Sequence, residues 1–580
     1  MIFLVLRRMR FPLLVLIAIY SIVLVGLTLM PGHIDDATGE VQYIDLFHAF
    51  YFVSFMGTTI GFGEIPQPFS AAQRLWVTFS IYLTVIAWVY AIGTLIALFQ
   101  NKSLQRSLRE MHFTSKVKNI CCPFYLICGY GETGRALVAT LEARGIRVVV
   151  IEQSEDVANT LIMENYPIDV PLLCADSRKP LYLQEAGLNN PHCQSVIAVT
   201  NNDSINLQIA ITSKLLNPKV QVICRTGSQE VAANMKSFGT DYIMNPFEVF
   251  AAGLHTTLCV PHLYLLREWF TGCIQNINYT LEQPPFKGLW ILCSYGRFGK
   301  AVYQRLKKEP GLHIIIIEAK PELTGYPEVE YVIGQGTEAS TLQEAHIEQA
   351  VGIIAGTNND VNNLSIVMTA RELSKTVGHK LFVVLRQNQT DNHDIFQAVG
   401  ANVIMPGNQA IADYIRVVLT TPMLVDFMKL AKKQGDDWAK TLLDTIHSFA
   451  DRDFLEHSPE IWETCIDARQ SPSVHLALQQ ESNIYLGDLL RNPRAREQKL
   501  SIIPLLLLRE HQYTLLPDED EALHSGDQIL WCGSHAARWW SEWAHKDHWI
   551  LDYLITGTLK SRGTVMCWLN KYAKKQGISP

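Results

Sequence analysis

The sequence predicts a small helical membrane domain, two tandem α/β domains with doubly wound parallel sheets, and a small α+β lobe. Three observations favour this fold class. Two apolar runs near the N-terminus are long enough to cross a bilayer, a glycine-rich turn between a strand and a helix follows them, and that unit occurs again further along the chain. We expect the domains to span residues 1–110, 120–285, 286–435 and 436–580.

Composition limits the classes of function. The 580 residues carry a formal net charge of −7 and are 48% hydrophobic, so any membrane part must be local. The chain has no long basic block, which argues against nucleic acid as a partner. Its 12 cysteines are scattered, without the spacing of a zinc site or a disulfide framework, and we interpret them as reduced cytosolic thiols.

The two apolar runs predict membrane-spanning helices surrounded by lipid. Phe11–Met30 and Leu75–Phe99 contain no charged side chain, and both are as long as a helix needs to be to cross a hydrocarbon core of about 30 Å. A signal peptide is the alternative for the first run, but its apolar stretch is too long and no small-residue cleavage motif follows. Basic residues precede the first run and follow the second, so we expect a multi-pass protein of the plasma (inner) membrane with both termini in the cytoplasm.

A short apolar segment and a glycine-rich loop lie between the two runs. Leu46–Met56 is too short to span a membrane and indicates a re-entrant half-helix. The next residues, Thr59–Gly63, should line a water-filled path, because non-helical backbone at membrane depth is tolerated only there or inside protein. Glycines let successive carbonyls turn to one side, where they can replace the hydration shell of a cation if several chains surround one axis.

This loop, TTIGFGE, resembles the selectivity filter of potassium channels, T-V-G-Y-G-D, flanked by an outer and an inner helix. The differences at Ile60, Phe62 and Glu64 keep the backbone chemistry but change the hydrogen bonds that brace such a filter. Gly93, in the second apolar run, is either the hinge of a gate in the inner helix or a helix-packing residue. The resemblance implies a K⁺-selective filter made by Thr59, Ile60, Gly61, Phe62 and Gly63, with K⁺ at the first four, and a homotetramer.

A dinucleotide-binding fingerprint follows the membrane segment. Residues 124–156, FYLICGYGETGRALVATLEARGIRVVVIEQSED, predict a strand, a glycine turn, a helix and a second strand. The glycines allow a tight turn, the approach of phosphates to a helix N-terminus, and close packing of helix on strand. An acidic residue at the end of the second strand can accept hydrogen bonds from ribose hydroxyls, which favours NAD or an adenosine nucleotide. The predicted nucleotide-binding residues of this stretch are Gly129, Tyr130, Gly131, Glu132, Thr133, Gly134 and Glu152.

The unit is repeated at residues 289–322, LWILCSYGRFGKAVYQRLKKEPGLHIIIIEAKPE. Later segments also correspond: LQEAGL matches LQEAHI, VTNNDSINL matches AGTNNDVNNL, and VICRTGSQE matches VVLRQNQTD, which pairs Arg225 with Arg386. Arg225 is therefore added to the first candidate site. Serine replaces the first glycine of the second copy, so this copy is either a second nucleotide site or a purely structural unit. The residues of the second candidate site are Ser294, Gly296, Arg297, Gly299 and Glu318.

Both copies, over residues 123–433, resemble the RCK domain (regulator of potassium conductance), which is similar to the N-terminal domain of Trk uptake regulators. The resemblance implies an acidic nucleotide-binding residue after the third strand, where the first copy has Asp176 and the second Gln335. It also implies that residues 407–434 form a long crossover helix through which such domains pair. Ser501–Gly533 resembles the β-rich C-terminal lobe of the family, with a hairpin turn at Gly526 and Asp527.

Together these patterns predict a tetrameric potassium channel gated by NAD or an adenosine nucleotide, with eight RCK domains in a cytosolic ring. An NAD-dependent membrane oxidoreductase is one alternative, but no substrate domain with a proton relay is evident, and we expect no enzyme activity. A regulatory subunit of a separate K⁺ transporter is the other, which a built-in filter makes unnecessary. The acidic run at residues 518–521 is a candidate divalent-cation site or a solvated loop.

Overall fold

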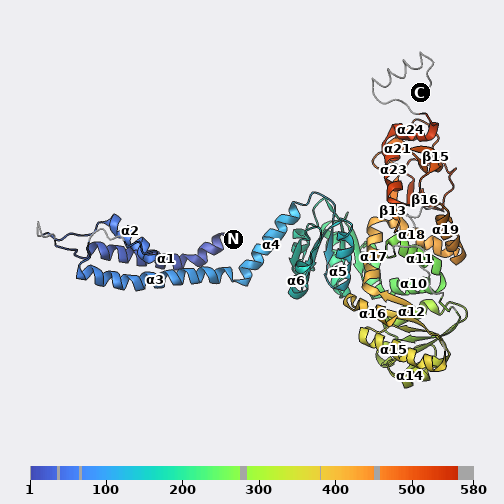
Figure 1. Ribbon diagram of the computed structural model, residues 1–580, viewed down its shortest axis with the longest axis horizontal. Coiled ribbons are helices and arrows are strands. Elements are labelled where there is room, and N and C mark those ends of the chain that lie inside the picture. Colours follow the sequence, from blue (N-terminus) through green and yellow to red (C-terminus); the bar gives the residue numbers. More distant parts are fainter. Residues whose placement is uncertain are drawn as a thin grey trace, which may run out of the picture. The chain divides into compact units, whose positions relative to one another are not determined.

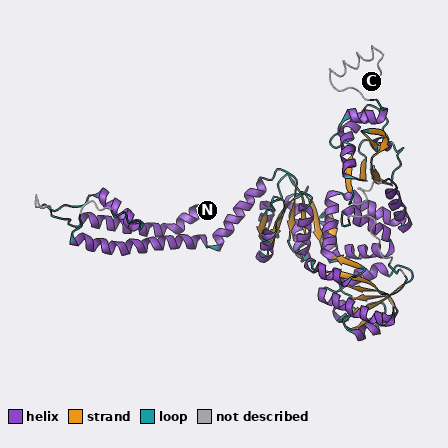
Figure 2. Cartoon of the chain, viewed as in Figure 1, coloured by secondary structure: helices purple, strands orange, loops and turns teal. Residues whose placement is uncertain are grey.

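The computed structural model describes most of the chain, in two compact units, Met1–Lys116 and Val117–Pro580, which are treated separately below (Figures 1 and 2). The described residues are 2–34, 40–63, 68–274, 284–285, 287–378, 380–449 and 457–558.

The first unit is helical. Helices α1 (Ile2–Leu29) and α3 (Ala71–Phe99) lie side by side, and the shorter α2 (Leu46–Gly57) packs against both. Two helical segments, Met9–Leu29 and Ala71–Leu98, are long and apolar enough to cross a membrane. A small core that includes Val23, Leu27, Ala49, Phe52 and Val53 holds the three helices together. The two long apolar helices predicted from the sequence are therefore present, followed by α4 (Lys102–Lys118).

Helix α2 is the predicted half-helix and ends one residue later than expected. Its first turn is capped by Asp45, whose side chain accepts a hydrogen bond from the backbone N–H of His48 at 3.1 Å. Its last residue lies against the hydroxyl of Tyr20, because a Cβ on Gly57 would be only 2.2 Å from that oxygen. The indole Nε1 of Trp88 donates to the same hydroxyl at 2.7 Å. Tyr20 thus joins α1, the end of α2 and α3.

The second unit begins with a six-stranded parallel sheet in the order β3-β2-β1-β4-β5-β6, the order of a doubly wound dinucleotide-binding fold. Its strands are nearly continuous apolar runs buried on both faces. The strands are β1 (Phe124–Cys128), β2 (Arg147–Glu152), β3 (Leu172–Cys174), β4 (Cys193–Ala198), β5 (Gln221–Arg225) and β6 (Tyr242–Met244), and the helices are α5 (Glu132–Glu142), α6 (Glu155–Met163), α7 (Pro180–Glu185), α8 (Asp203–Leu216) and α9 (Gln229–Ser237).

A second parallel sheet repeats this topology, with the strand order β12-β11-β10-β7-β8-β9. The predicted internal repeat is therefore confirmed as two sheets of the same design. The strands are β7 (Gly288–Cys293), β8 (Leu312–Glu318), β9 (Tyr331–Ile333), β10 (Ala350–Ala355), β11 (Phe382–Gln387) and β12 (Val403–Pro406), and the helices are α12 (Arg297–Leu306), α13 (Pro321–Thr324), α14 (Ala339–Glu344), α15 (Asp360–Val377) and α16 (His393–Val399), with 3-10 turns at Ile347–Gln349 and Thr390–Asn392.

A pair of helices follows each sheet: α10 (Pro246–Cys259) and α11 (Pro261–Thr271) after the first, α17 (Gly407–Thr420) and α18 (Pro422–Gln434) after the second. The prediction of one long helix over 407–434 is wrong. The chain leaves the helical conformation at Thr421 (φ −150°, ψ 64°) and a new helix begins at Pro422. Proline lacks the N–H that would continue the first helix, and it restricts the residue before it.

The first helix of each pair packs on the sheet domain of the other repeat. Phe250 and Leu254 of α10 join the core around Trp290 of the second sheet, whereas Ile411 and Ile415 of α17 join the core of the first sheet. Figure 1 shows α17 beside α5 and α10 beside α12. This exchange ties the two sheet domains to each other through apolar packing.

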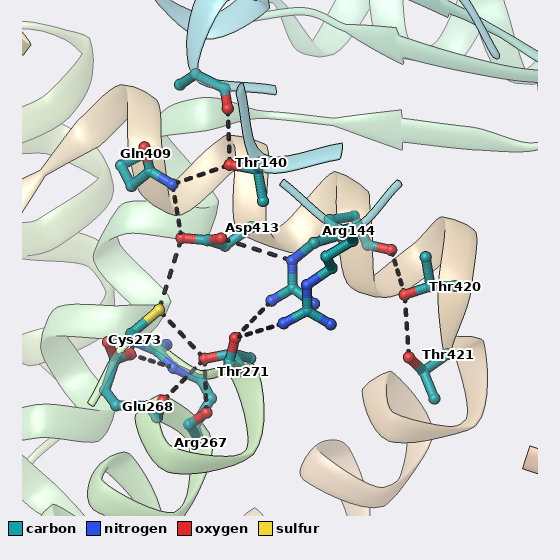
Figure 3. Close-up of polar contacts among 12 residues, drawn as sticks. Thr140, Arg144, Arg267, Glu268, Thr271, Cys273, Gln409, Asp413, Thr420 and Thr421 are labelled. Carbon is teal, nitrogen blue, oxygen red and sulfur yellow. Dashed lines mark hydrogen bonds and ion pairs between the residues drawn. The ribbon is translucent and has the colours of Figure 1, made fainter. Parts of the chain in front are cut away.

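Polar contacts reinforce the junction of α5, α11 and α17 (Figure 3). The carbonyl of Thr271 accepts hydrogen bonds from the Nη2 atoms of Arg144 and Arg416, at 3.4 and 2.9 Å. The Sγ of Cys273 donates to Oδ2 of Asp413 at 3.6 Å, and burial raises the pKa of that carboxyl. Both repeats therefore contribute to one partly buried polar cluster.

The C-terminal lobe is small and mixed, as predicted, and packs on α19 (Asp436–Phe449) and α18 through a shared apolar core. Its main sheet is antiparallel in the order β13-β18-β16-β17. Its strands are β13 (Glu460–Cys465), β14 (Arg491–Asn492), β15 (Ala495–Lys499), β16 (Ile502–Arg509), β17 (Gln512–Leu515) and β18 (Gln528–Gly533), and its helices are α21 (Pro472–Gln479), α22 (Leu486–Leu489), α23 (His535–Lys546) and α24 (His548–Thr556).

The predicted hairpin turn at Gly526 and Asp527 is wrong. These residues precede β18, which pairs with β13 and β16 rather than with the preceding strand β17. The hairpin turn joins β16 to β17 at Glu510 and His511, whose φ angles of 45° and 67° are typical of a two-residue turn with the twist of the strands. Asp527 instead accepts hydrogen bonds from Arg509 at 2.8 and 3.0 Å.

Candidate functional site

The predicted filter loop, Thr59–Gly63, follows directly from the last turn of α2. The carbonyl of Phe55 accepts hydrogen bonds from the N–H groups of Ile60 and Gly61, at 3.1 and 3.4 Å. The φ angles of Thr59, Gly61 and Gly63 are positive, at 59°, 63° and 76°, whereas the two residues between them are not in this region. Such alternation belongs to neither a helix nor a strand. The role of the loop as a carbonyl ladder stays a prediction.

The two glycines of this loop are required by conformation rather than by space. A Cβ added to Gly61 or Gly63 would meet no atom of this chain within 4 Å, but a positive φ disfavours any residue with a side chain. Thr59 adopts it nonetheless, which is a local strain typical of functional loops. Gly93 lies within the continuous helix α3, and a Cβ there would also meet nothing within 4 Å. Its role as a gate hinge stays a prediction.

The glycine turn after β1 has the geometry predicted for a phosphate-binding loop. Gly129 has a φ of 103°, and a Cβ on Gly134 would lie 2.1 Å from the Gly129 carbonyl, so this glycine permits the close approach of α5 to the turn. In contrast, a Cβ on Gly131 would meet only Asn201 Nδ2, at 3.9 Å. The space in front of Gly131 is therefore open at the N-terminus of α5, where backbone N–H groups favour an anion.

Glu152, at the end of β2, lies beside this turn. Its Oε2 accepts a hydrogen bond from the N–H of Tyr130 at 2.6 Å, and its Oε1 accepts one from Ser154 at 2.8 Å. Each carboxylate oxygen has two lone pairs, so both oxygens keep the capacity to accept a further hydroxyl. The carboxylate thus braces the turn and remains able to hold a ribose.

Two residues of the predicted set use their side chains elsewhere. The buried side chain of Tyr130 donates its hydroxyl to Glu164 Oε2 at 2.6 Å, and burial raises the pKa of this phenol. The hydroxyl of Thr133 donates to Oδ1 of Asn408, on α17, at 3.0 Å. Only the backbone of these two residues therefore faces the turn, and their side chains hold the surrounding structure.

The other predicted residues lie along the same edge of the sheet. Glu132 is exposed at the first position of α5. Asp176, after β3, binds the guanidinium of Arg178 at 2.8 and 2.9 Å, and this hydrogen bonding lowers the pKa of Asp176. Arg225, at the end of β5, donates through Nη1 to Asn201 Oδ1 at 2.6 Å.

Asn201 was not predicted as a site residue. Its position beside Gly131, bonded to Arg225, makes it a part of the site. The signal for it was the segment TNND, which occurs in both copies.

The second glycine turn keeps the same backbone although it begins with serine. Ser294 has a φ of 95°, close to the 103° of Gly129, and a Cβ on Gly299 would lie 1.9 Å from the Ser294 carbonyl. Glu318 accepts hydrogen bonds from the N–H groups of Tyr295 and Lys320, at 2.5 and 3.1 Å. The nearest atom to a Cβ on Gly296 is Ser294 Oγ, at 3.7 Å. The serine is therefore accommodated without loss of the turn.

Two arginines lie near the second turn. Arg386, the counterpart of Arg225, donates to Asn358 Oδ1 at 2.9 Å and stacks on Phe298 at 4.8 Å, and burial lowers its pKa to about 10. Arg297 leaves its own turn and lies over the ring of Phe247, on α10, at 4.9 Å. Burial is the main cause of the lowered pKa of both Arg225 and Arg386, and the positive charge of Arg297 lowers both pKa values further. Arg297 of the second copy also lies against the first copy, since a Cβ on Gly227 would be 2.9 Å from its Nη1.

Two carboxylates of the acidic run at residues 518–521 form ion pairs with basic side chains. Glu519 pairs with Lys499 at 2.6 Å, and Glu521 pairs with Arg509 at 2.7 Å. These pairs neutralise two of the four carboxylates, and the choice between a cation site and a solvated loop stays open.

Comparison with known proteins agrees with this arrangement. The TrkA-N domain family matches residues 125–246 and 290–406, which contain the two parallel sheets. The chain therefore contains two tandem segments that are similar to this domain. The chain is also similar to potassium channel proteins of archaea and bacteria.

Two such relatives are potassium channel protein 1 and probable potassium channel protein 2 of Methanocaldococcus jannaschii. They are 26% and 25% identical to this chain over 212 and 209 residues, which is 36% of this chain in each case. A TrkA homologue of the Trk potassium uptake system of Methanothermobacter thermautotrophicus is 27% identical over 144 residues, or 24% of this chain. The matches span 61%, 59% and 64% of these three relatives.

Solved structures with a similar chain include the GsuK channel and the GsuK channel bound to NAD. The first is 17% identical, with a TM-score of 0.49 over 95% of this chain and 99% of that chain. The second is 16% identical, with a TM-score of 0.48 over 94% of this chain and 99% of that chain.

Proposed function

We propose that this chain is the subunit of a tetrameric, potassium-selective channel that nucleotide binding to its cytosolic domains opens or closes. The observation that carries the proposal is the alternating backbone of Thr59–Gly63, directly after α2 and between two helices long enough to cross a membrane. A loop of this conformation presents several carbonyl oxygens on one side, which is what a dehydrated monovalent cation needs.

The surroundings of the loop favour a cation. Helix α2 ends at the loop, and the partial negative charge of a helix C-terminus stabilises positive charge nearby. Tyr20 holds this end of α2 between α1 and α3. One chain supplies one strand of carbonyls, so four chains around an axis complete the cage, and K⁺ is held by the carbonyls of Thr59, Ile60, Gly61 and Phe62.

The ligand of the cytosolic domains is NAD or an adenosine nucleotide. The open space at Gly131 supports a pyrophosphate at the N-terminus of α5, and Glu152 lies where it can accept the ribose hydroxyls. Arg225 and Asn201 approach the same space from the ends of β5 and β4 and supply a positive charge and hydrogen-bonding groups. The second turn has equivalent groups, with Arg386 and Asn358.

The end of α4 is held to the first sheet domain. The side-chain amide of Asn190 donates to the carbonyls of Val117 and Ile120, at 3.5 and 3.4 Å. The Val117 side chain also packs beside Gly187, where a Cβ would approach it to 2.8 Å. The last turn of α4 is therefore fixed to the first sheet domain, so a nucleotide-dependent movement of that domain displaces α4, which follows α3.

Flux measurements on the purified full chain in liposomes test the proposal. We expect K⁺ to permeate far better than Na⁺, and the K⁺ flux to change when NAD or ADP is added to the side that carries the cytosolic domains. Equal permeation of the two ions contradicts the selective pore. A K⁺ flux that does not change with either nucleotide contradicts the gating but not the selective pore.

A further inference from the structure

A histidine, a cysteine and a glutamate meet where α10, α18 and the loop between α12 and β8 come together. His255 and Cys259 are one turn apart on α10, and Glu309 belongs to that loop. One donor atom from each residue lies within 4.8 Å of the other two, and His255 Nε2 is 2.7 Å from Glu309 Oε1. These residues belong neither to the predicted filter loop, Thr59–Gly63, nor to the two glycine turns.

The donor set is that of a zinc site. An imidazole nitrogen, a thiolate sulfur and a carboxylate oxygen are the three ligand types that Zn²⁺ takes from proteins. With metal–ligand distances of about 2.0–2.3 Å, two ligands of a tetrahedral ion lie about 3–4 Å apart. The three side chains therefore need only small rotations to reach one ion, because their donor atoms already lie within 4.8 Å of one another.

The histidine and the glutamate of this cluster are partly shielded from solvent. The side chains of His255 and Glu309 are 13% and 24% exposed. The Nζ of Lys432, on α18, lies 3.0 Å from Nδ1 of His255, which orients the ring so that Nε2 faces Glu309. A histidine that binds a metal through Nε2 carries its proton on Nδ1, and Lys432 can accept that proton only as a neutral amine.

We propose that His255, Cys259 and Glu309 bind Zn²⁺, with water as the fourth ligand. Binding displaces the proton of the Cys259 thiol and the Nε2 proton of His255, and both are released to solvent. One proton moves from the Lys432 ammonium to Nδ1, and the neutral amine then accepts the Nδ1–H. The bound ion joins the crossover helix of the first repeat to a loop of the second sheet domain, beside α18 of the second repeat. It therefore holds α10 against the sheet domain of the other repeat.

Metal binding to the tag-free full chain in detergent, first stripped with a chelator, tests this site. We expect the parent protein to bind one more zinc ion per chain than Cys259→Ser, and Co²⁺ in place of Zn²⁺ to give the intense near-ultraviolet absorption of a thiolate–cobalt bond. His255→Gln and Glu309→Gln should each weaken zinc binding at least about tenfold. Cys273→Ser is the matched control, because Cys273 also contacts a carboxylate, Asp413, but has no histidine in that cluster.

Three results overturn the proposal: zinc binding that is unchanged by Cys259→Ser, a cobalt complex without the thiolate absorption, or an equal loss of zinc binding in Cys273→Ser. A further measurement needs no variant and so does not depend on the folding of one. Zinc should slow the alkylation of Cys259 in the parent protein, as followed by mass spectrometry, by at least about tenfold relative to the alkylation of Cys273. Equal rates with and without zinc overturn the site as well.

Discussion

The backbone N–H of Tyr130 donates a hydrogen bond to Oε2 of Glu152 at 2.6 Å, which ties the first glycine turn to the end of β2. The residue that the sequence predicts as a ribose ligand therefore also braces the loop that is predicted to hold the phosphates. The same pair recurs in the second copy, between Tyr295 and Glu318.

Substitution of Glu152 should separate these two roles. Glu152→Gln keeps one oxygen for a backbone N–H, whereas Glu152→Ala leaves the N–H groups of Tyr130 and Ser154 without their acceptor. We expect Glu152→Ala to weaken NAD or ADP binding about tenfold or more, since a hydrogen bond to a charged group contributes about 1.5–3 kcal/mol, and Glu152→Gln to weaken it less. Calorimetry on the full chain measures this, with Glu318→Ala as the matched change in the second copy. Identical affinity in Glu152→Ala and the parent contradicts the role of Glu152.

Gly131 and Gly134 should respond to substitution in opposite ways. Gly131 has an extended backbone (φ −67°, ψ −171°) and open space around it, so Gly131→Val should leave the melting temperature unchanged but exclude the phosphates. Gly134→Ala places a Cβ 2.1 Å from the Gly129 carbonyl and should lower the stability of the domain by a few kcal/mol.

Thermal unfolding and nucleotide titration of both variants check this expectation, with Gly296→Val as the control in the second copy. Full nucleotide affinity in Gly131→Val means that the open space at this turn is not the phosphate site.

Gly61→Ala should abolish K⁺ flux. The φ of 63° costs an L-residue about 1 kcal/mol or more, so the backbone relaxes and its carbonyls leave the axis. Gly239→Ala imposes the same kind of strain in open space outside the membrane unit, at a φ of 78°, and should conduct normally. Flux in liposomes distinguishes them, and K⁺ flux at the parent rate in Gly61→Ala rules out the loop as the filter.

Assembly gives an independent test of the pore. Native mass spectrometry in detergent should show four copies of the 65.5 kDa chain, because one chain provides one strand of a four-fold cage. Each chain also brings two sheet domains, so eight of them are available for a ring without a separate soluble subunit. A stable dimer as the largest species contradicts the tetramer.

Stability of the C-terminal lobe should fall as pH rises through neutrality. Glu463, on β13, accepts a hydrogen bond from the N–H of Met423 at 2.7 Å, and burial raises its pKa from 4.5 to about 7. The folded chain therefore keeps this proton where the unfolded chain has lost it, so the contribution to stability is full below pH 4.5 and is lost as pH rises through 7.

Glu463→Gln, which stays neutral, should be about 1–3 kcal/mol more stable than the parent at pH 8 and similar to it near pH 5. Thermal unfolding followed by tryptophan fluorescence measures the difference, and the exposed carboxylate of Glu497, changed to Gln, serves as the control. An equal gain at both pH values refutes the assignment to Glu463.

The sequence by itself determined the two long apolar helices, the half-helix α2, the duplicated glycine turns and the parallel sheets of both repeats. These features are local or periodic: an uncharged run of sufficient length, a turn that only a few residues permit, or alternation of buried strands with amphipathic helices. The one long crossover helix was wrong because Pro422 ends a helix that the apolar pattern continues. The misplaced hairpin turn was wrong because strand pairing in the lobe is not sequential.

Only the tertiary structure decided which side chains meet. The exchange of α10 and α17 between the repeats, the bond from Thr133 to Asn408, and the placement of Arg297 on Phe247 all join residues that no local pattern connects. His255 and Glu309 are likewise 54 positions apart and meet only because α10 packs on α12. Contacts of this kind depend on the packing of whole elements against one another, in which shape and buried apolar area select the partner.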